Sequence, residues 1–163
     1  MNYFSIRTNF QPSIIDLLEG KTNLEFNGLS WHRDEINLGD IAFIVISGDS
    51  SKKELQYLNG LRAIGQIISF PEDDGQKHFK LNLKILILFE ESLTKDDFYN
   101  FPELKNAPNI GPTTTNEPNQ AFRKVFKNQA EAIIKAISVL QNKPLPSIFE
   151  KVINGKKIQY LSL

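Results

Sequence analysis

The chain of 163 residues contains no cysteine and only two histidines, His32 and His78. Without thiols the protein has no disulfide bonds, no thiolate nucleophile and no cysteine-ligated zinc. A zinc site built on two histidines needs further ligands at a suitable spacing, and the carboxylates of this chain do not supply that spacing. We therefore predict no metal and no cofactor.

Long apolar runs are also missing. No stretch approaches the roughly 20 apolar residues of a membrane-spanning helix, and the N-terminus lacks the basic and then apolar order of a signal peptide. These absences predict a cytoplasmic protein with no membrane partner.

Several catalytic signatures are absent as well. The sequence contains neither the phosphate-binding G-x-x-x-x-G-K-[ST] motif nor the G-x-S-x-G turn of serine hydrolases. A metal-dependent nuclease needs an acidic residue followed by an acid-x-Lys pair, but the segment 81–84 lacks the second acid. The sequence therefore favours a binding module over an enzyme.

The charge is balanced overall but unevenly distributed. Residues 1–76 contain 6 Lys/Arg and 11 Asp/Glu, a net charge of −5, whereas residues 77–163 contain 13 and 8, a net charge of +5. A basic half can supply contacts to phosphate groups, although a solvated helix face would give the same count.

Periodicity and turn residues predict an α+β domain with a small, curved or closed sheet. Alternating or continuous apolar runs indicate strands at 3–7, 23–27, 41–46, 61–70 and 79–89, with Gly28 ending the second. The run 41–46 is almost wholly apolar, so we expect a strand buried on both faces. We expect Phe4 and Phe43 in the core.

Two helices are predicted beside the sheet. Pro12 begins a short one that Gly20 closes, which is the usual asymmetry of helix ends. A long helix is predicted from Pro118 to about Leu140, because apolar residues such as Phe122 and Phe126 recur at steps of three and four. The dipeptide Asn154-Gly155 predicts a terminal hairpin. We expect residues 1–142 to form the domain and 143–163 an extension.

Two segments carry candidate binding groups. The single tryptophan, Trp31, either fills the core or offers a ring for stacking. The loop from Pro108 to Asn116 combines prolines, a glycine and polar side chains ahead of the long helix. It either holds a phosphate or only caps the helix.

The order of several motifs resembles EVE domains, which belong to the PUA-like group together with the YTH readers of methylated RNA. The motifs are Tyr3-Phe4, the segments 13–17 and 38–43, and Gly60 to Ile68. The segment 109–114, with residues 118–121 and 130–133, resembles the EVE-type domains fused to McrB-like GTPases of modification-dependent restriction systems.

This resemblance implies a PUA-like (EVE/YTH-type) small curved β-barrel flanked by helices, with a pocket that receives a modified base flipped out of the duplex. Such a pocket needs stacking walls, polar groups for the base edge and cations for the backbone. The resemblance implies Trp31 as the stacking wall. It implies these residues as readers of the base edge: Ser30, Asn9, Ser47 and Asn109. Candidates for phosphate contact are Lys52, Lys53, Arg62, Thr113, Thr114, Arg123 and Lys124.

The leading hypothesis is thus a non-catalytic domain that binds double-stranded DNA containing a modified base, which we expect to be methylated. It would act with a downstream AAA+ GTPase motor and a nuclease subunit. One alternative keeps the fold but binds single-stranded or methylated RNA. Another is a protein-interaction domain in which Trp31 is buried and the pocket is vestigial.

Overall fold

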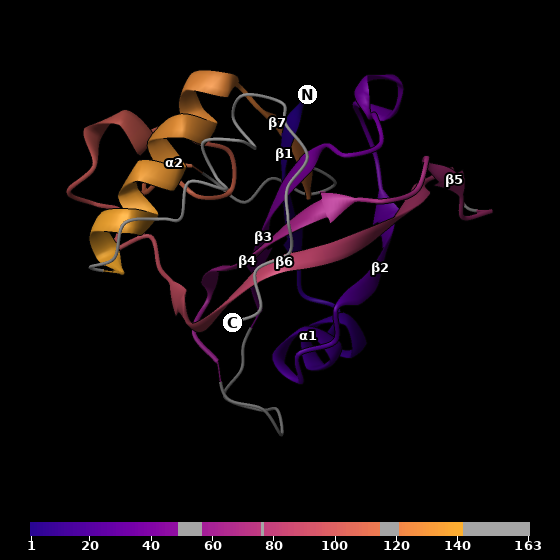
Figure 1. The fold of residues 1–163 in the computed structure, drawn as a ribbon, viewed down its shortest axis with the longest axis horizontal. Coiled ribbons are helices and arrows are strands. Elements are labelled where there is room, and N and C mark those ends of the chain that lie inside the picture. Colours follow the sequence, from indigo (N-terminus) through magenta and orange to yellow (C-terminus); the bar gives the residue numbers. More distant parts are fainter. Residues whose placement is uncertain (49–56, 76, 115–120, 142–163) are drawn as a thin grey trace.

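The computed structural model describes residues 1–48, 57–75, 77–114 and 121–141, and these form one curled sheet with a helix on each side (Figure 1). The strands are β1 (Tyr3–Thr8), β2 (Asn23–Leu29), β3 (Ile41–Ile46), β4 (Gly60–Ile67), β5 (Glu72–Asp73), β6 (Phe79–Leu93) and β7 (Phe122–Val125). The helices are α1 (Gln11–Leu18) and α2 (Lys127–Leu140), with short 3₁₀ turns η1 (Arg33–Glu35) and η3 (Pro102–Leu104).

The strands lie in the order β2-β6-β4-β3-β1-β7, and β5 pairs with the start of β6. Strands β1 and β3 pair in parallel, whereas the other strand pairs are antiparallel. The sheet curls into a half-barrel, as the sequence predicts. The central strand β3 is buried along all six residues, which confirms that it is covered on both faces.

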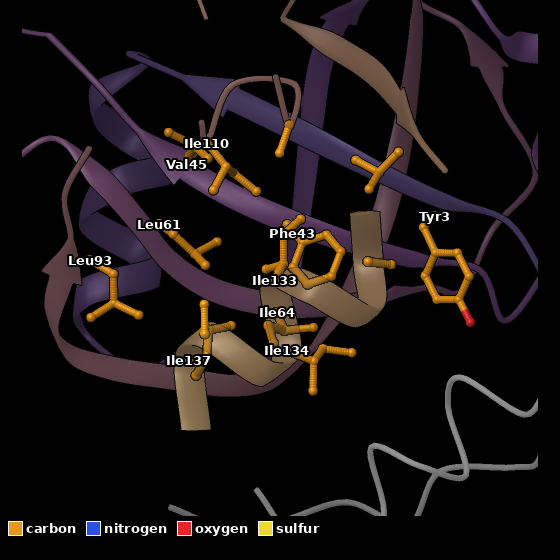
Figure 2. Packing of buried hydrophobic residues seen from close by; sticks show 14 of the residues in the cluster. Tyr3, Phe43, Val45, Leu61, Ile64, Leu93, Ile110, Ile133, Ile134 and Ile137 are labelled. Carbon is orange, nitrogen blue, oxygen red and sulfur yellow. The ribbon is translucent and has the colours of Figure 1, made fainter. Parts of the chain in front are cut away.

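Each face of the sheet packs against its own apolar layer. One layer joins Tyr3, Phe43 and Ile64 to the buried side of α2, including Ile133 and Ile137 (Figure 2). The other layer joins the opposite faces of the same strands to α1 and β2. Phe4 and Phe43 are both fully buried, one in each layer, which confirms their predicted place in the core.

The predicted helix from Pro118 was wrong in its first part. Phe122–Val125 is a strand that pairs antiparallel with β1, and α2 begins only at Lys127. The side-chain oxygen of Gln129 accepts a hydrogen bond from the backbone N–H of Phe126 at 2.9 Å, which caps the helix at this point. The apolar stripe at helical spacing is therefore divided between a strand and a helix, and Phe126 is 61% exposed.

One smaller prediction also needs correction. Gly28 does not end the second strand, because β2 continues to Leu29 past an irregular register after Phe26. Thr94 and Asp97 exchange reciprocal hydrogen bonds, with the Thr94 N–H donating at 2.7 Å and the Asp97 N–H donating at 3.2 Å. A helical turn follows β6 at this point, in which the Phe98 N–H donates to the Thr94 carbonyl oxygen at 3.3 Å. The hairpin predicted at Asn154-Gly155 lies outside the described residues.

Candidate nucleic-acid interface

A cavity of about 290 Å³ opens at one end of the sheet. β1 and β3 both end there because they run parallel, β4 begins there, and β6 ends there. The loop after η3 closes the remaining side with Asn109 and Ile110. The cavity is therefore assembled from four strand ends and one loop that are far apart in the sequence.

Aliphatic side chains form the cavity wall on the α2 side of the sheet. Val45, Leu61, Leu93 and Ile110 gather at this end of the layer, while Tyr3 lies at the other end (Figure 2). Gly60 allows β4 to start against the end of β6, since a Cβ atom at this position would lie 2.3 Å from the Leu93 carbonyl oxygen. Among the described lining residues none is aromatic.

Two cations line the cavity, Arg7 at the end of β1 and Lys95 just after β6. Burial lowers the pKa of the Arg7 guanidinium, and the nearby charge of Arg123 lowers this pKa further. Burial also lowers the pKa of the Lys95 ammonium, with a further contribution from the charge of Arg7. Lys95 donates a hydrogen bond to the carbonyl oxygen of Thr114 at 2.5 Å. The cavity is electropositive because two cations share a partly desolvated space, and the resulting repulsion contributes to the lowered pKa of Lys95.

Ser47 lies at the rim, directly after β3. Its backbone N–H donates to the Thr8 carbonyl oxygen at 2.9 Å, which continues the β1–β3 ladder by one residue. Tyr57 donates its hydroxyl to the Ser47 carbonyl oxygen at 3.1 Å and is itself buried. The rim is thus fixed by hydrogen bonds on both sides of Ser47.

Asn109 holds the loop against the sheet from the other side. Its side chain is buried, and its amide nitrogen donates to Ser5 Oγ at 2.9 Å and to the Ala121 carbonyl oxygen at 3.3 Å. The residue has a φ of +64°, a left-handed conformation that asparagine tolerates better than most residues. Since both donor contacts are made within the protein, the carbonyl oxygen is the part of this amide that remains for a ligand.

A second, larger groove of about 680 Å³ runs along the open side of the half-barrel, between β2 and the start of β7. Asn9, predicted to read a base edge, lines this groove and not the first cavity, and Arg7 lines both. Glu25, Asp73 and other polar groups line the remainder, so the groove carries both signs of charge.

Trp31 and Ser30 line neither the cavity nor the groove. Trp31 is 65% exposed, so the alternative in which it is buried in the core is wrong. It lies four residues before Glu35, whose backbone oxygen accepts a hydrogen bond from Asn2 at the N-terminal end of β1. The cavity lies at the opposite end of β1, roughly 17 Å along the strand from this contact between Asn2 and Glu35. The Ser30 hydroxyl is 3.3 Å from His78 Nδ1.

The residues predicted to contact phosphate are dispersed. Arg62 donates to the Glu90 carbonyl oxygen at 2.6 Å, and Lys124 pairs with Glu35 at 2.6 Å. The hydroxyls of Thr113 and Thr114 donate to carbonyl oxygens of Lys105 and Gly111 at 2.5 and 2.7 Å. Arg123 contributes its charge beside Arg7. Lys52 and Lys53 lie outside the described residues.

Of the predicted base-reading residues the cavity thus brings together Ser47 and Asn109. The sequence analysis did not select Arg7 and Lys95. The sequence feature that could have identified Arg7 is its position at the end of the first predicted strand, since residues there project from one end of the sheet. Lys95 sits between Thr94 and the turn residue Asp97, and nothing in that local pattern indicates a partner 88 positions earlier in the chain.

Within the described residues no cluster of His, Asp and Glu that could hold a metal ion is found. No helix in the described part of the chain is both long and apolar enough to cross a membrane.

The chain matches no protein-family profile and no curated protein. Solved structures are similar in fold. A hypothetical protein from Leishmania major superposes with a TM-score of 0.64 at 13% identity, covering 86% of this chain and 97% of that one. A protein from Pseudomonas putida gives 0.60 at 12% identity, covering 82% and 98%.

Human THYN1, solved in complex with DNA that contains 5-methylcytosine, superposes with a TM-score of 0.54 at 11% identity. The match covers 88% of this chain and all of the THYN1 chain. At such low identities the likeness concerns the fold. The curled α+β sheet with its two helices matches the PUA-like fold.

Proposed function

We propose that this protein is a DNA-binding specificity domain that holds a modified base in the cavity at the ends of β1 and β3. The observation that carries the proposal is the cavity itself. It is electropositive, with Arg7 and Lys95 in its lining, and it occurs in a fold shared with a protein that was solved with methylated DNA.

The size and wall of the cavity suit one flipped nucleotide. At about 290 Å³ it lies at the low end of ligand pockets, which run from roughly 300 to 1,000 Å³. A flipped base must regain the few kcal/mol that it loses on leaving the stack, and apolar side chains can supply contact to its two faces. Leu61, Leu93 and Ile110 are placed to do so, with Ser47 and the Asn109 carbonyl oxygen available to the base edge.

Electrostatic attraction between cationic side chains and the DNA backbone would be the second contribution to binding. Contacts from lysine and arginine to phosphate groups release counterions, so the affinity falls as the salt concentration rises. Arg123, Lys52 and Lys53 are candidates for such contacts, and Arg7 with Lys95 would act closer to the flipped nucleotide. We expect no chemical step, since the domain would only bind.

Fluorescence anisotropy tests the proposal with duplexes that differ at one base: unmodified, N6-methyladenine, 5-methylcytosine or 5-hydroxymethylcytosine, with a matched RNA as a further arm. We expect at least about tenfold tighter binding of one modified duplex, equivalent to roughly 1.4 kcal/mol. Ser47→Phe, which fills the rim, should remove the preference. Ser30→Phe is the matched control outside the cavity and should retain it.

Trp31→Ala belongs to the same experiment because the sequence predicts Trp31 as the stacking wall. The geometry favours the cavity, so we expect this variant to keep the preference. Loss of the preference in Trp31→Ala but not in Ser47→Phe would move the site away from the cavity. Equal binding of every duplex by the parent protein would overturn the proposed function, and tighter binding of the RNA would change the ligand.

We further propose that the domain serves a McrB-like restriction system in the cytoplasm, in which a GTPase motor and a nuclease reside in other domains or subunits. The order of motifs described above supports this placement. GTP hydrolysis by such a motor should rise with modified duplex only when this domain is attached. Stimulation by modified DNA without the domain would contradict it.

A further inference from the structure

The cavity carries more positive charge than the binding of a base with an uncharged modification requires. Arg7 and Lys95 both line it, and the charge of Arg123 reaches Arg7. Among the described lining residues the one acid is Asp96, which is exposed. A flipped base therefore meets two cations against a mostly aliphatic wall.

Arg7 reaches below the surface at this point. Its Nη1 atom is fully buried, so one end of the guanidinium is held inside the protein, and a ligand in the cavity would meet the other N–H groups of Arg7. A guanidinium donates parallel hydrogen bonds in a fixed plane and matches two adjacent acceptor oxygens, as in a carboxylate. The ammonium of Lys95 is a point charge that adds to the attraction without demanding one geometry.

We infer that the cavity selects a base whose modification adds a negatively charged two-oxygen group, with 5-carboxylcytosine as the probe, over a base with an uncharged methyl group. This inference rests on the proposed function, because it assumes that a flipped base enters the cavity. A carboxylate would lie between Arg7 and Lys95 and relieve the repulsion between them. A methyl group would gain contact with the aliphatic wall but leave that repulsion unchanged.

The test compares three duplexes that are identical except at one cytosine: unmodified, 5-methyl and 5-carboxyl. We expect the 5-carboxyl duplex to bind at least about tenfold more tightly than the 5-methyl duplex at moderate salt. Arg7→Gln and Lys95→Met should each bring this ratio close to one. The matched controls are Arg33→Gln and Lys135→Met, which remove the same charges from exposed positions outside the cavity and should leave the ratio unchanged.

The outcomes separate the inference from the function on which it rests. If the 5-methyl duplex binds as tightly as the 5-carboxyl duplex and both bind more tightly than the unmodified one, the inference is overturned and the function stands. Equal binding of all three overturns the function. If Arg7→Gln and Lys95→Met weaken all three duplexes equally, the two cations contact the DNA backbone and the inference again fails. Lys95 is only partly buried, so Lys95→Met carries the test should Arg7→Gln not fold.

Discussion

Among single residues, Asn109 does most to fix the shape of the cavity. It sits in a left-handed conformation that asparagine adopts more readily than residues with longer or branched side chains. Its amide joins the loop to Ser5 on β1 and to Ala121 just before β7. The predicted role of Asn109 as a reader of the base stays a prediction, and a role in positioning the loop is now evident from these contacts.

Replacing Asn109 in two ways separates its amide from its backbone conformation. Asn109→Gly loses the hydrogen bonds but accepts the positive φ, so we expect a loss of about 1–3 kcal/mol in the free energy of unfolding. Asn109→Ala should lose roughly a further 1 kcal/mol because a Cβ is strained in this conformation. Urea denaturation measures both. Equal stability of the two variants would show that the left-handed backbone carries no cost.

Among the elements, β7 is the strand that the helical spacing of apolar residues led us to assign to a helix. Phe122 stacks on Phe4 with ring centroids 4.7 Å apart and meets Phe79 edge-on at 5.8 Å. Phe79 begins β6 and Phe4 lies on β1, so these rings join two ends of the curled sheet. The strand closes the core at a place where a helix would leave the outer edge of β1 without a partner.

A pair of phenylalanine substitutions tests this arrangement. Phe122→Ala removes a fully enclosed ring, and we expect a loss of about 3–5 kcal/mol in the free energy of unfolding. Phe126→Ala removes an exposed ring four residues later and should change it by less than about 0.5 kcal/mol. The continuous helical stripe predicts similar losses for both. Chemical denaturation of the two variants therefore distinguishes the strand from the helix.

A second feature at this scale is the bulge between β4 and β6. The register passes from Leu61 opposite Leu93 to Ala63 opposite Leu88, so β6 has three more residues than β4 in this interval. Arg62 spans the bulge with hydrogen bonds to the Glu90 carbonyl oxygen at 2.6 Å and to Ser92 Oγ at 3.4 Å. Burial lowers the pKa of its guanidinium. We interpret Arg62 as a residue that stabilises β6, which ends at the cavity.

We therefore expect Arg62→Met to lower the free energy of unfolding by about 1.5–3 kcal/mol, the usual range for hydrogen bonds from a charged group. The slope of log affinity against log salt concentration for unmodified DNA should stay the same. A phosphate contact would instead reduce that slope by about 1. Denaturation and a salt titration of DNA binding together decide between the two roles.

On the scale of the whole molecule, the sheet keeps two apolar layers apart and leaves one end open. Because that end collects Arg7 from β1 and Lys95 from beyond β6, the electropositive cavity depends on the complete strand order. The unequal distribution of charge along the sequence does not by itself locate this site, since Arg7 belongs to the acidic half of the chain.

This placement predicts a dependence of binding on pH. The pKa of Lys95 lies below the ordinary lysine value of 10.5, so its ammonium loses the proton earlier than other lysines as the pH rises. As the pH rises toward 10.5, the affinity for a 5-carboxylcytosine duplex should therefore fall more steeply in the parent protein than in Lys95→Met. Anisotropy titrations across this range test the prediction, and parallel curves for the two proteins would contradict it.

The sequence by itself determined the local elements. The apolar run of β3 needs cover on both faces, Pro12 and Gly20 bound α1, and the order of motifs led to the PUA-like fold. These features depend on neighbouring residues, because strand and helix periods repeat within a few positions. The same reasoning failed at Phe122, where two phenylalanines at helical spacing belong to different elements and pairing with β1 outweighed the local pattern.

Only the tertiary structure decided the composition of the cavity. Arg7, Ser47, Lys95 and Asn109 meet because the parallel pair β1–β3 ends where β6 ends and where the loop after η3 folds back. Trp31, the most conspicuous candidate in the sequence, lies on the surface and does not line the cavity. Residue type indicates what chemistry a side chain can perform, whereas long-range strand pairing decides which side chains perform it together.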